Sequence, residues 1–172
     1  MAKKCLAKKL NEPSSFEILS EISGITWPEH HRNLCENQCS KAKPVDILMA
    51  LRDKIIDAPS RKSVIVFCQS TGQHNLLEAN TEIALSMEGQ SYGGCWAIWE
   101  KPEDDAANIK WQNEVCAILK KFTNTHYIGE TDIVQDPTRI QNSYTSAKWK
   151  KLEQIRAKYD PQGLFFGYLG GI

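Results

Sequence analysis

The sequence predicts an α+β fold, with one antiparallel sheet of about four strands and helices packed mainly on one face of it. Two observations lead to this expectation. Short β-branched and aromatic runs at residues 63–69 and 92–99 are typical of strands. Longer segments at residues 44–58 and 103–121 carry apolar residues at helical spacing. A sheet flanked by such helices forms layers around one core.

The helices have recognisable beginnings and ends. Pro44 suits the first turn of a helix, where its missing N–H needs no partner. The helix over residues 103–121 has acids in its first turn and lysines in its last, which matches the helix dipole. Three shorter helices are expected, over residues 15–22, 138–143 and 146–159. Ser14 or Ser15 would cap the first of them, and Pro161 ends the last because proline cannot continue a helix.

Two further strands are expected, over residues 80–85 and 127–131. Gly93 and Gly94 interrupt the pattern of the 92–99 strand, and glycine at such a place often marks a bulge or the close approach of another backbone or a ligand. The glycine pair therefore indicates either a local break in pairing or a crowded neighbour.

The composition is ordinary for a globular domain. The 172 residues fit one domain and are 41% hydrophobic and 24% charged. Basic and acidic residues number 21 each, so a concentrated basic face for nucleic acid is not expected. The sequence contains no run of about 18 apolar residues, so a membrane span is not expected. The N-terminus lacks the apolar segment of a secretory signal. A cytoplasmic protein is expected.

The six cysteines are irregularly spaced and are expected to be free thiols in a reducing compartment. Cys68, Cys95 and Cys116 fall at predicted core positions. None of the three has the local features of a catalytic nucleophile, which needs a base beside the thiol.

One cluster has the side chains that bind zinc: His30, His31, Cys35 and Cys39. On a helix, His31 and Cys39 would lie about 12 Å apart, too far for one ion. A loop could gather them, but no second Cys/His pair follows at zinc-finger spacing. A surface histidine pair with packed thiols is therefore expected, and no metal site.

No glycine-rich phosphate loop follows a predicted strand, so the sequence has no nucleotide-binding fingerprint. It does have an aromatic and acidic group, made of Tyr92, Trp96, Trp99, Tyr127 and Tyr144 alongside Glu82, Glu88 and Glu130. Aromatic groups of this kind usually form a core or an interface. A half-buried carboxylate among them can act as a general base. The sequence leaves open which carboxylates converge.

Two segments in the middle of the chain carry a family resemblance. Residues 82–92 resemble a strand that runs from an acidic residue to a His-Arg pair, although Met87 and Glu88 stand in place of that pair. Residues 99–111, from Trp99 through Pro102 to Trp111, resemble the transition from a strand to the following helix.

Two later segments add to the resemblance. Residues 127–130 are similar to a Tyr-x-Asn segment, with Tyr127 retained and Gly129 in place of the asparagine. Residues 149–165 resemble a C-terminal helix followed by a Tyr-Asp-Pro turn and an apolar end.

From about Thr81 onward, these segments together resemble the substrate-domain half of FAD-linked oxidases of the berberine bridge enzyme type. The resemblance implies FAD as the cofactor and hydride transfer from a small-molecule substrate to the flavin. It implies Glu82 as the catalytic base and Tyr127 as its hydrogen-bonding partner. It also implies a substrate pocket lined by Tyr92, Trp96 and Glu130.

The same resemblance sets the expected domain organisation. Residues 1–172 are expected to form a single domain that resembles the substrate-binding domain plus the C-terminal berberine-bridge-like segment, without the FAD-binding domain. Such a chain would work with a separately encoded FAD-binding domain, or be the remnant or excised part of a longer enzyme, and would be inactive alone. The alternative is a non-catalytic, stand-alone α+β module derived from that fold, which serves binding or homodimerisation.

Overall fold

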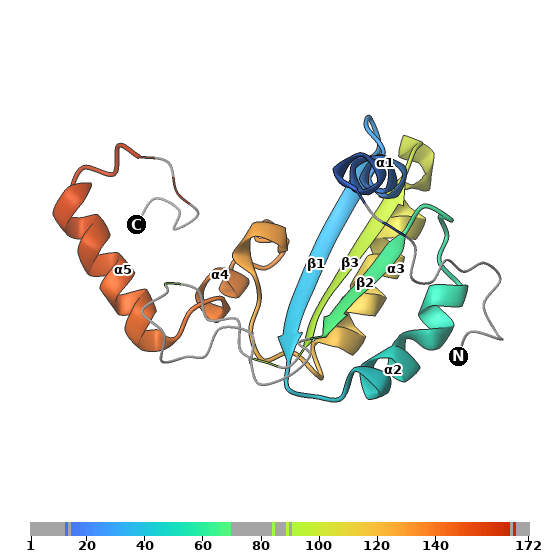
Figure 1. The fold of residues 1–172 in the computed structure, drawn as a ribbon. Coiled ribbons are helices and arrows are strands. Elements are labelled where there is room, and N and C mark those ends of the chain that lie inside the picture. Colours follow the sequence, from blue (N-terminus) through green and yellow to red (C-terminus); the bar gives the residue numbers. More distant parts are fainter. Residues whose placement is uncertain are drawn as a thin grey trace.

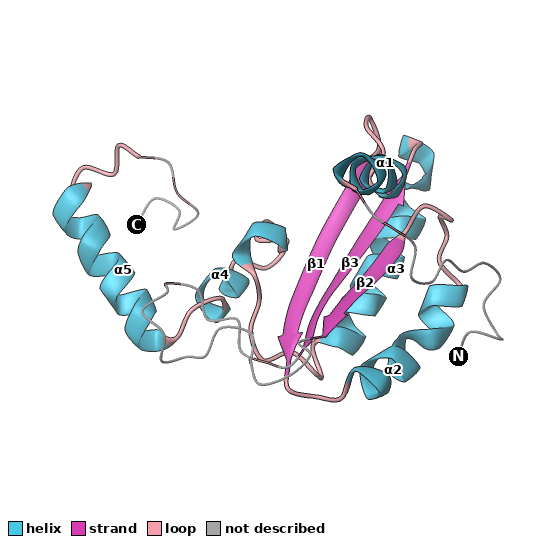
Figure 2. Cartoon of the chain, viewed as in Figure 1, coloured by secondary structure: helices cyan, strands magenta, loops and turns pink. Residues whose placement is uncertain are grey.

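The computed structural model describes residues 13, 15–69, 84, 89, 91–165 and 167 (Figure 1). Its longer elements are α1 (Phe16–Thr26), β1 (Arg32–Ser40), α2 (Pro44–Ile56), β2 (Val64–Gln69), β3 (Ser91–Trp99), α3 (Asp105–Leu119), α4 (Thr138–Asn142) and α5 (Ser146–Tyr159). Two short 3-10 helices complete them, η2 (Pro102–Asp104) and η3 (Ile128–Glu130). The mixture of helices and strands is the predicted α+β class (Figure 2).

The described strands form one antiparallel sheet in the order β1-β3-β2. In this sheet Glu36 lies opposite Cys95, and Cys35 lies opposite Trp96. Paired residues share a face and successive residues alternate between faces. Cys95 belongs to the hydrophobic core that the helices cover, so we call its side of the sheet the helix face and the side of Trp96 the opposite face.

The core lies between the helix face and two helices. Cys95, Ala97 and Trp99 of β3 pack with residues of α2 and α3, namely Ile47, Leu51, Trp111, Val115 and Leu119. The indole N–H of Trp111 also donates to the carbonyl of Lys54 at 2.8 Å, which joins the two helices. In Figure 1, α3 lies behind the strands. Helices on one face of an antiparallel sheet are what the sequence predicts.

All five predicted helices are confirmed, although α1 continues to Thr26 and does not end at residue 22. Pro44 occupies the first turn of α2. Ser15 caps α1 by accepting a hydrogen bond from the Ile18 N–H at 3.4 Å. The helix that ends before Pro161 is α5, and the Asp160 carboxylate holds the turn by accepting from the N–H of Leu164 at 2.6 Å. Across the described residues, no helix is both long and apolar enough to cross a bilayer.

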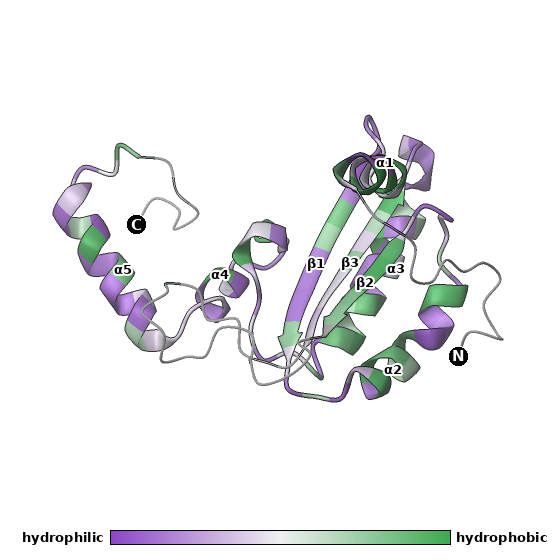
Figure 3. Cartoon of the chain, in the orientation of Figure 1, coloured by the Kyte–Doolittle hydropathy of each residue, from purple (hydrophilic) through white to green (hydrophobic). Residues whose placement is uncertain are grey.

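The strand β1 is absent from the sequence prediction, because its middle is polar. Figure 3 shows this hydrophilic stretch in β1, in contrast to the apolar β2 at the other edge of the sheet. Glu36, Asn37 and Gln38 of β1 are nevertheless buried. Most of their side-chain polar atoms are stabilised by partners far along the chain, such as the Asn37 side chain with Tyr127. Polar residues can form a buried strand only when such partners exist, and these partners are invisible in the local sequence.

The predicted strand over residues 127–131 is wrong. The structure has the 3-10 turn η3 there, closed by the Glu130 N–H donating to the Tyr127 carbonyl at 3.1 Å. The Tyr127 N–H donates to the side-chain oxygen of Asn37 at 2.7 Å. A side chain thus replaces the ladder partner that a strand would need. The predicted strand over residues 80–85 lies outside the described residues apart from Ala84.

The edge of β1 is covered by the segment that follows α3. The Cys39 N–H donates to the Thr125 carbonyl at 2.8 Å, and the Asn124 N–H donates to the Cys39 carbonyl at 2.9 Å. An uncovered strand edge would expose these groups to pairing with other chains. This cover brings residues 124–139 alongside β1, where the polar residues of both segments meet.

The glycine pair in β3 is explained by crowding and not by a bulge, because β3 pairs without interruption on both sides. A Cβ atom on Gly93 would lie 2.7 Å from the ring of Phe67, closer than real contacts allow. The ring of Trp96 occupies the corresponding space at Gly94. The close neighbours are therefore aromatic rings of the chain itself.

Candidate functional site

A tyrosine and a carboxylate meet on the opposite face of the sheet. Tyr92 on β3 donates a hydrogen bond from its hydroxyl to the carboxylate of Glu130 on η3. Burial, and then this carboxylate, raise the pKa of Tyr92 well above its ordinary value. The phenol therefore stays protonated at neutral pH and serves as a donor.

Cys35 holds the backbone of Glu130. Its thiol donates to the Glu130 carbonyl at 3.1 Å. Burial, followed by the neighbouring Glu130 charge, raises the pKa of Cys35 to about 12. The thiol is thus a neutral donor that positions Glu130, not a nucleophile.

The aromatic wall beside this pair is formed by Trp96 and Trp27. Their ring centroids lie 5.6 Å apart with an interplanar angle of 79°, an edge-to-face contact that aromatic pairs prefer. Trp27 follows α1, and Figure 1 shows α1 in front of one end of the strands. Trp96 remains half-buried, so part of its ring stays accessible.

The structure thus brings together three predicted site residues, Tyr92, Trp96 and Glu130, on or beside one face of the sheet. Tyr127 lies two residues after Thr125 on the covering segment, and its backbone is held by both polar atoms of the Asn37 side chain at 2.7 Å. The predicted base Glu82 lies outside the described residues, as does Glu88.

A second feature of the molecule is a pocket with a volume of about 460 Å³ at the sheet edge. Residues of β1, of α3 and of the 123–142 segment line it. Glu36 lies at its base and is one of the most buried charged residues described. Its carboxylate accepts from the Thr131 hydroxyl at 2.7 Å and from the Asn37 N–H at 2.9 Å.

Two basic side chains complete the environment of Glu36. Arg139 forms an ion pair with its carboxylate, and the Nδ1 atom of His126 lies 3.3 Å from the carboxylate oxygen. A buried carboxylate needs such charged and hydrogen-bonding partners because desolvation is costly. No local spacing in the sequence connects Glu36, His126 and Arg139, because three segments far apart in the sequence contribute them.

The cysteine predictions have mixed outcomes. Cys95 is buried in the core and Cys116 is half-buried, but Cys68 is exposed, so its assignment to the core is wrong. Cys68 lies opposite Tyr92 in the sheet, so its side chain is on the face away from the helix-covered core. Burial, and then the Glu36 charge, raise the pKa of Cys116 to about 12, which leaves a protonated thiol in the pocket wall.

The zinc-like cluster is arranged along β1 and the turn before it. Cys35 and Cys39 lie on the strand, and His31 immediately precedes it. His31 uses its Nδ1 atom in a contact of 2.8 Å with the Glu29 carbonyl. Within the part of the chain that the structure describes, no group of three or more His, Cys, Asp or Glu side chains is arranged to hold a metal ion.

No family model and no curated protein matches this sequence. Solved structures do match its fold. One is GilR in complex with pregilvocarcin, an oxidoreductase that catalyses the terminal step of gilvocarcin biosynthesis: TM-score 0.64 and 18% identity, covering 80% of this chain and 32% of GilR. Another is CrmK, a flavoenzyme involved in shunt product recycling in caerulomycin biosynthesis: TM-score 0.64 and 16% identity, with the same coverage of 80% and 32%.

The class that the fold defines is therefore an α+β domain that is similar to part of an oxidoreductase and part of a flavoenzyme. This chain spans about a third of the length of each of these two proteins. At these identities the likeness concerns the fold, and function has to be argued from the site.

Proposed function

We propose that residues 1–172 form a single domain, the substrate-domain part of a cytoplasmic FAD-linked oxidoreductase of the berberine bridge enzyme type, which needs a separate FAD-binding domain for activity. The observation that carries this proposal is the hydrogen-bonded pair of Tyr92 and Glu130 beside Trp96 on the opposite face of the sheet. The fold shared with part of a flavoenzyme supports it.

The described residues of the opposite face suit the flavin ring of FAD but not its phosphates. Trp96 and Tyr92 offer aromatic surface against which a flat flavin ring can pack. None of the described strand residues that the register places on this face is a Lys, Arg or His that could bind a pyrophosphate. The phosphates would therefore be held by the other domain. Bound FAD would accept the hydride from the substrate carbon.

The residues of this chain would handle the proton and the position of the substrate. A substrate hydroxyl or amine that is being oxidised must lose a proton as its carbon loses the hydride. Tyr92 would accept that proton as its own hydroxyl proton passes to Glu130, so that no phenolate has to accumulate. This path agrees with the raised pKa of Tyr92. Glu82, the base that the resemblance implies, is a second acceptor to be tested.

Two exposed apolar residues after α5 support the proposal that another domain packs against this one. Leu164 and Phe165 follow α5 and are 77% and 72% exposed. The Arg156 guanidinium donates to the Phe165 carbonyl at 3.0 Å and so holds this apolar end in place. Apolar side chains presented in this way are typical of a surface that another domain covers.

The first experiment uses the chain alone. The purified protein is titrated with FAD while flavin fluorescence is recorded, and its visible absorbance is examined for bound flavin. We expect neither bound flavin nor quenching. Tight binding of FAD by the chain alone would contradict the need for a separate domain. A stable homodimer that binds no flavin domain would favour the alternative of a binding or dimerisation module.

The second experiment uses the chain assembled with its FAD-binding domain, encoded either next to it or in the same gene. Anaerobic reduction of the flavin is followed by stopped-flow absorbance with alcohol and amine substrates. Glu130→Gln should slow flavin reduction about 100-fold or more, the usual effect of losing a general base. Glu103→Gln, at an exposed position, is the matched control and should have no effect. An unchanged rate in Glu130→Gln with a large loss in Glu82→Gln would move the base to Glu82.

A further inference from the structure

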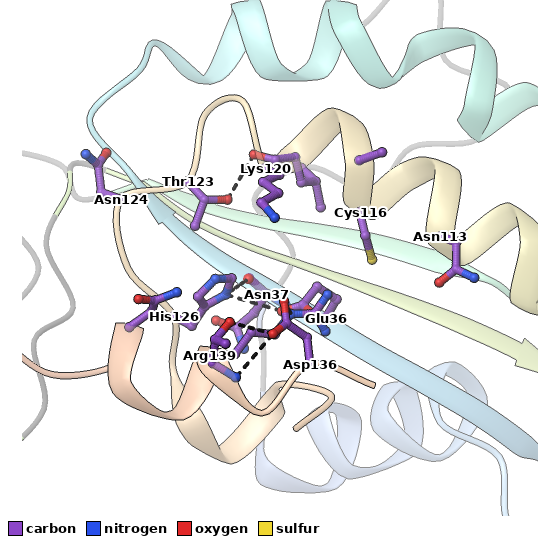
Figure 4. Close-up of a pocket in the computed structure, with 14 residues that line it drawn as sticks. Glu36, Asn37, Asn113, Cys116, Lys120, Thr123, Asn124, His126, Asp136 and Arg139 are labelled. Atoms are coloured by element: carbon purple, nitrogen blue, oxygen red, sulfur yellow. Dashed lines mark hydrogen bonds and ion pairs between the residues drawn. The ribbon is translucent and has the colours of Figure 1, made fainter. Parts of the chain in front are cut away.

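The pocket of about 460 Å³ is separate from the proposed flavin side of the sheet. Cys35 and Glu36 are neighbours on β1, and successive strand residues point to opposite faces. Cys35 contacts Glu130, whereas Glu36 lines the pocket. Figure 4 shows Asn113 and Cys116 on α3 at one side of the pocket, with Glu36, His126 and Arg139 at the other.

His126 is held in one orientation in this pocket. Its Nδ1 atom lies 2.7 Å from the Asn37 carbonyl oxygen and 3.3 Å from the Glu36 carboxylate. Both neighbours are acceptors only, so Nδ1 must carry the hydrogen. Whenever the ring is neutral, its lone pair is therefore on Nε2. Among the described residues, no group forms a hydrogen bond with Nε2 of His126. Since Nε2 is also not one of the buried polar atoms without a partner, it is accessible.

Of the two cations that line the pocket, Arg139 is held by carboxylates, whereas Lys120 acts on the Asp136 carboxylate only from beyond ion-pair distance. Glu36 pairs with Arg139, which also lies 3.6 Å from the Asp136 carboxylate. Lys120 forms no ion pair with any residue that the structure describes, and its side chain extends from the end of α3 into the pocket in Figure 4. The lining also carries the side-chain amides of Asn113 and Asn142. An acceptor, a cation and neutral amides therefore face one space.

We propose that this pocket binds a small hydroxylated anion such as a sugar phosphate or a sugar acid, with a ligand hydroxyl donating to Nε2 of His126 and the anionic group pairing with Lys120. The volume lies within the range of small-molecule sites, and a few placed polar groups are what orient a ligand in such sites. The protonated thiol of Cys116 forms part of the wall and takes no covalent role. The site does not depend on the proposed flavin chemistry.

Isothermal titration calorimetry of the full chain without flavin tests the site. The probes are glucose 6-phosphate, gluconate, neutral glucose and inorganic phosphate. We expect at least one of the two sugar anions to bind about tenfold or more tightly than glucose, because a charge-assisted hydrogen bond is added. A preference between the two sugar anions identifies the anionic group. Equal binding of glucose, or no binding of either sugar anion, would overturn the proposal.

Variants locate the binding. Lys120→Ala should weaken the sugar anion about tenfold, whereas the matched control Lys121→Ala, at the next exposed lysine outside the pocket lining, should not. His126→Asn keeps a donor for the Asn37 carbonyl but lacks Nε2, and should weaken binding about fivefold. Equal losses in the two lysine variants would mean that binding is non-specific and would refute the site. This outcome is independent of any flavin measurement.

Discussion

Arg139 on α4 forms an ion pair with Glu36 on β1, and the two side chains are only 17% and 4% exposed. The arginine also donates to the Asp132 carbonyl at 3.0 Å. One half-buried guanidinium thus joins the strand, α4 and the loop before it. The covering segment along β1 depends on this contact as well as on its backbone hydrogen bonds.

Replacing Arg139 should therefore destabilise the protein strongly. Arg139→Met leaves the Glu36 carboxylate buried without its counter-charge, and breaking a buried pair in this way costs about 3–5 kcal/mol. Urea unfolding followed by circular dichroism measures the loss. The control is Arg32→Met, which removes the more exposed pair with Asp105, at 48% and 29% exposure, and should cost about 1 kcal/mol or less. Similar losses in both variants would mean that Arg139 does not compensate a buried charge.

Glycine substitutions should have opposite effects in β3 and in α1. Gly93→Ala would place a Cβ atom 2.7 Å from the Phe67 ring and should lower stability by about 1–3 kcal/mol through overpacking. Gly24→Ala lies in α1 with no atom within 4 Å of the added Cβ, so it should raise stability by up to about 1 kcal/mol. Thermal unfolding measures both. Phe67→Leu should recover part of the loss in Gly93→Ala, and a failure to do so would place the strain elsewhere.

The elements that the sequence predicts well are those whose signals are local. Pro44 and the apolar spacing after it define α2, and Pro161 defines the end of α5. The polar strand β1 has no such signal, because Glu36 and Asn37 become buried only through partners beyond residue 120. The pocket could not be predicted for the same reason. Tyr92 and Glu130 were predictable as candidates, but their hydrogen bond depends on the turn η3, where the sequence suggests a strand.

Thiol labelling should separate the described cysteines by burial. Cys68 is exposed, while Cys95 is 0% exposed and its thiol donates to the Gln112 side-chain oxygen at 3.2 Å. Iodoacetamide should therefore modify Cys68 in the folded protein and Cys95 only after unfolding. Mass spectrometry of digested samples, with and without urea, measures the two sites. Modification of Cys95 as fast as Cys68 would show that β3 opens readily.

Alkaline pH should destabilise the fold through Cys116. Burial raises the pKa of this thiol from 9.0 to about 12, so the folded chain keeps it protonated where the unfolded chain ionises it. The stabilising effect is complete below about pH 9 and is lost as pH rises from 9 towards 12, by up to about 1.4 kcal/mol per pH unit. Urea midpoints measured between about pH 8 and 10.5 should fall. Cys116→Ser should make this fall less steep, whereas Cys68→Ser, at an exposed position, should leave it unchanged. Equal slopes in all three proteins would show that Cys116 does not govern the alkaline transition.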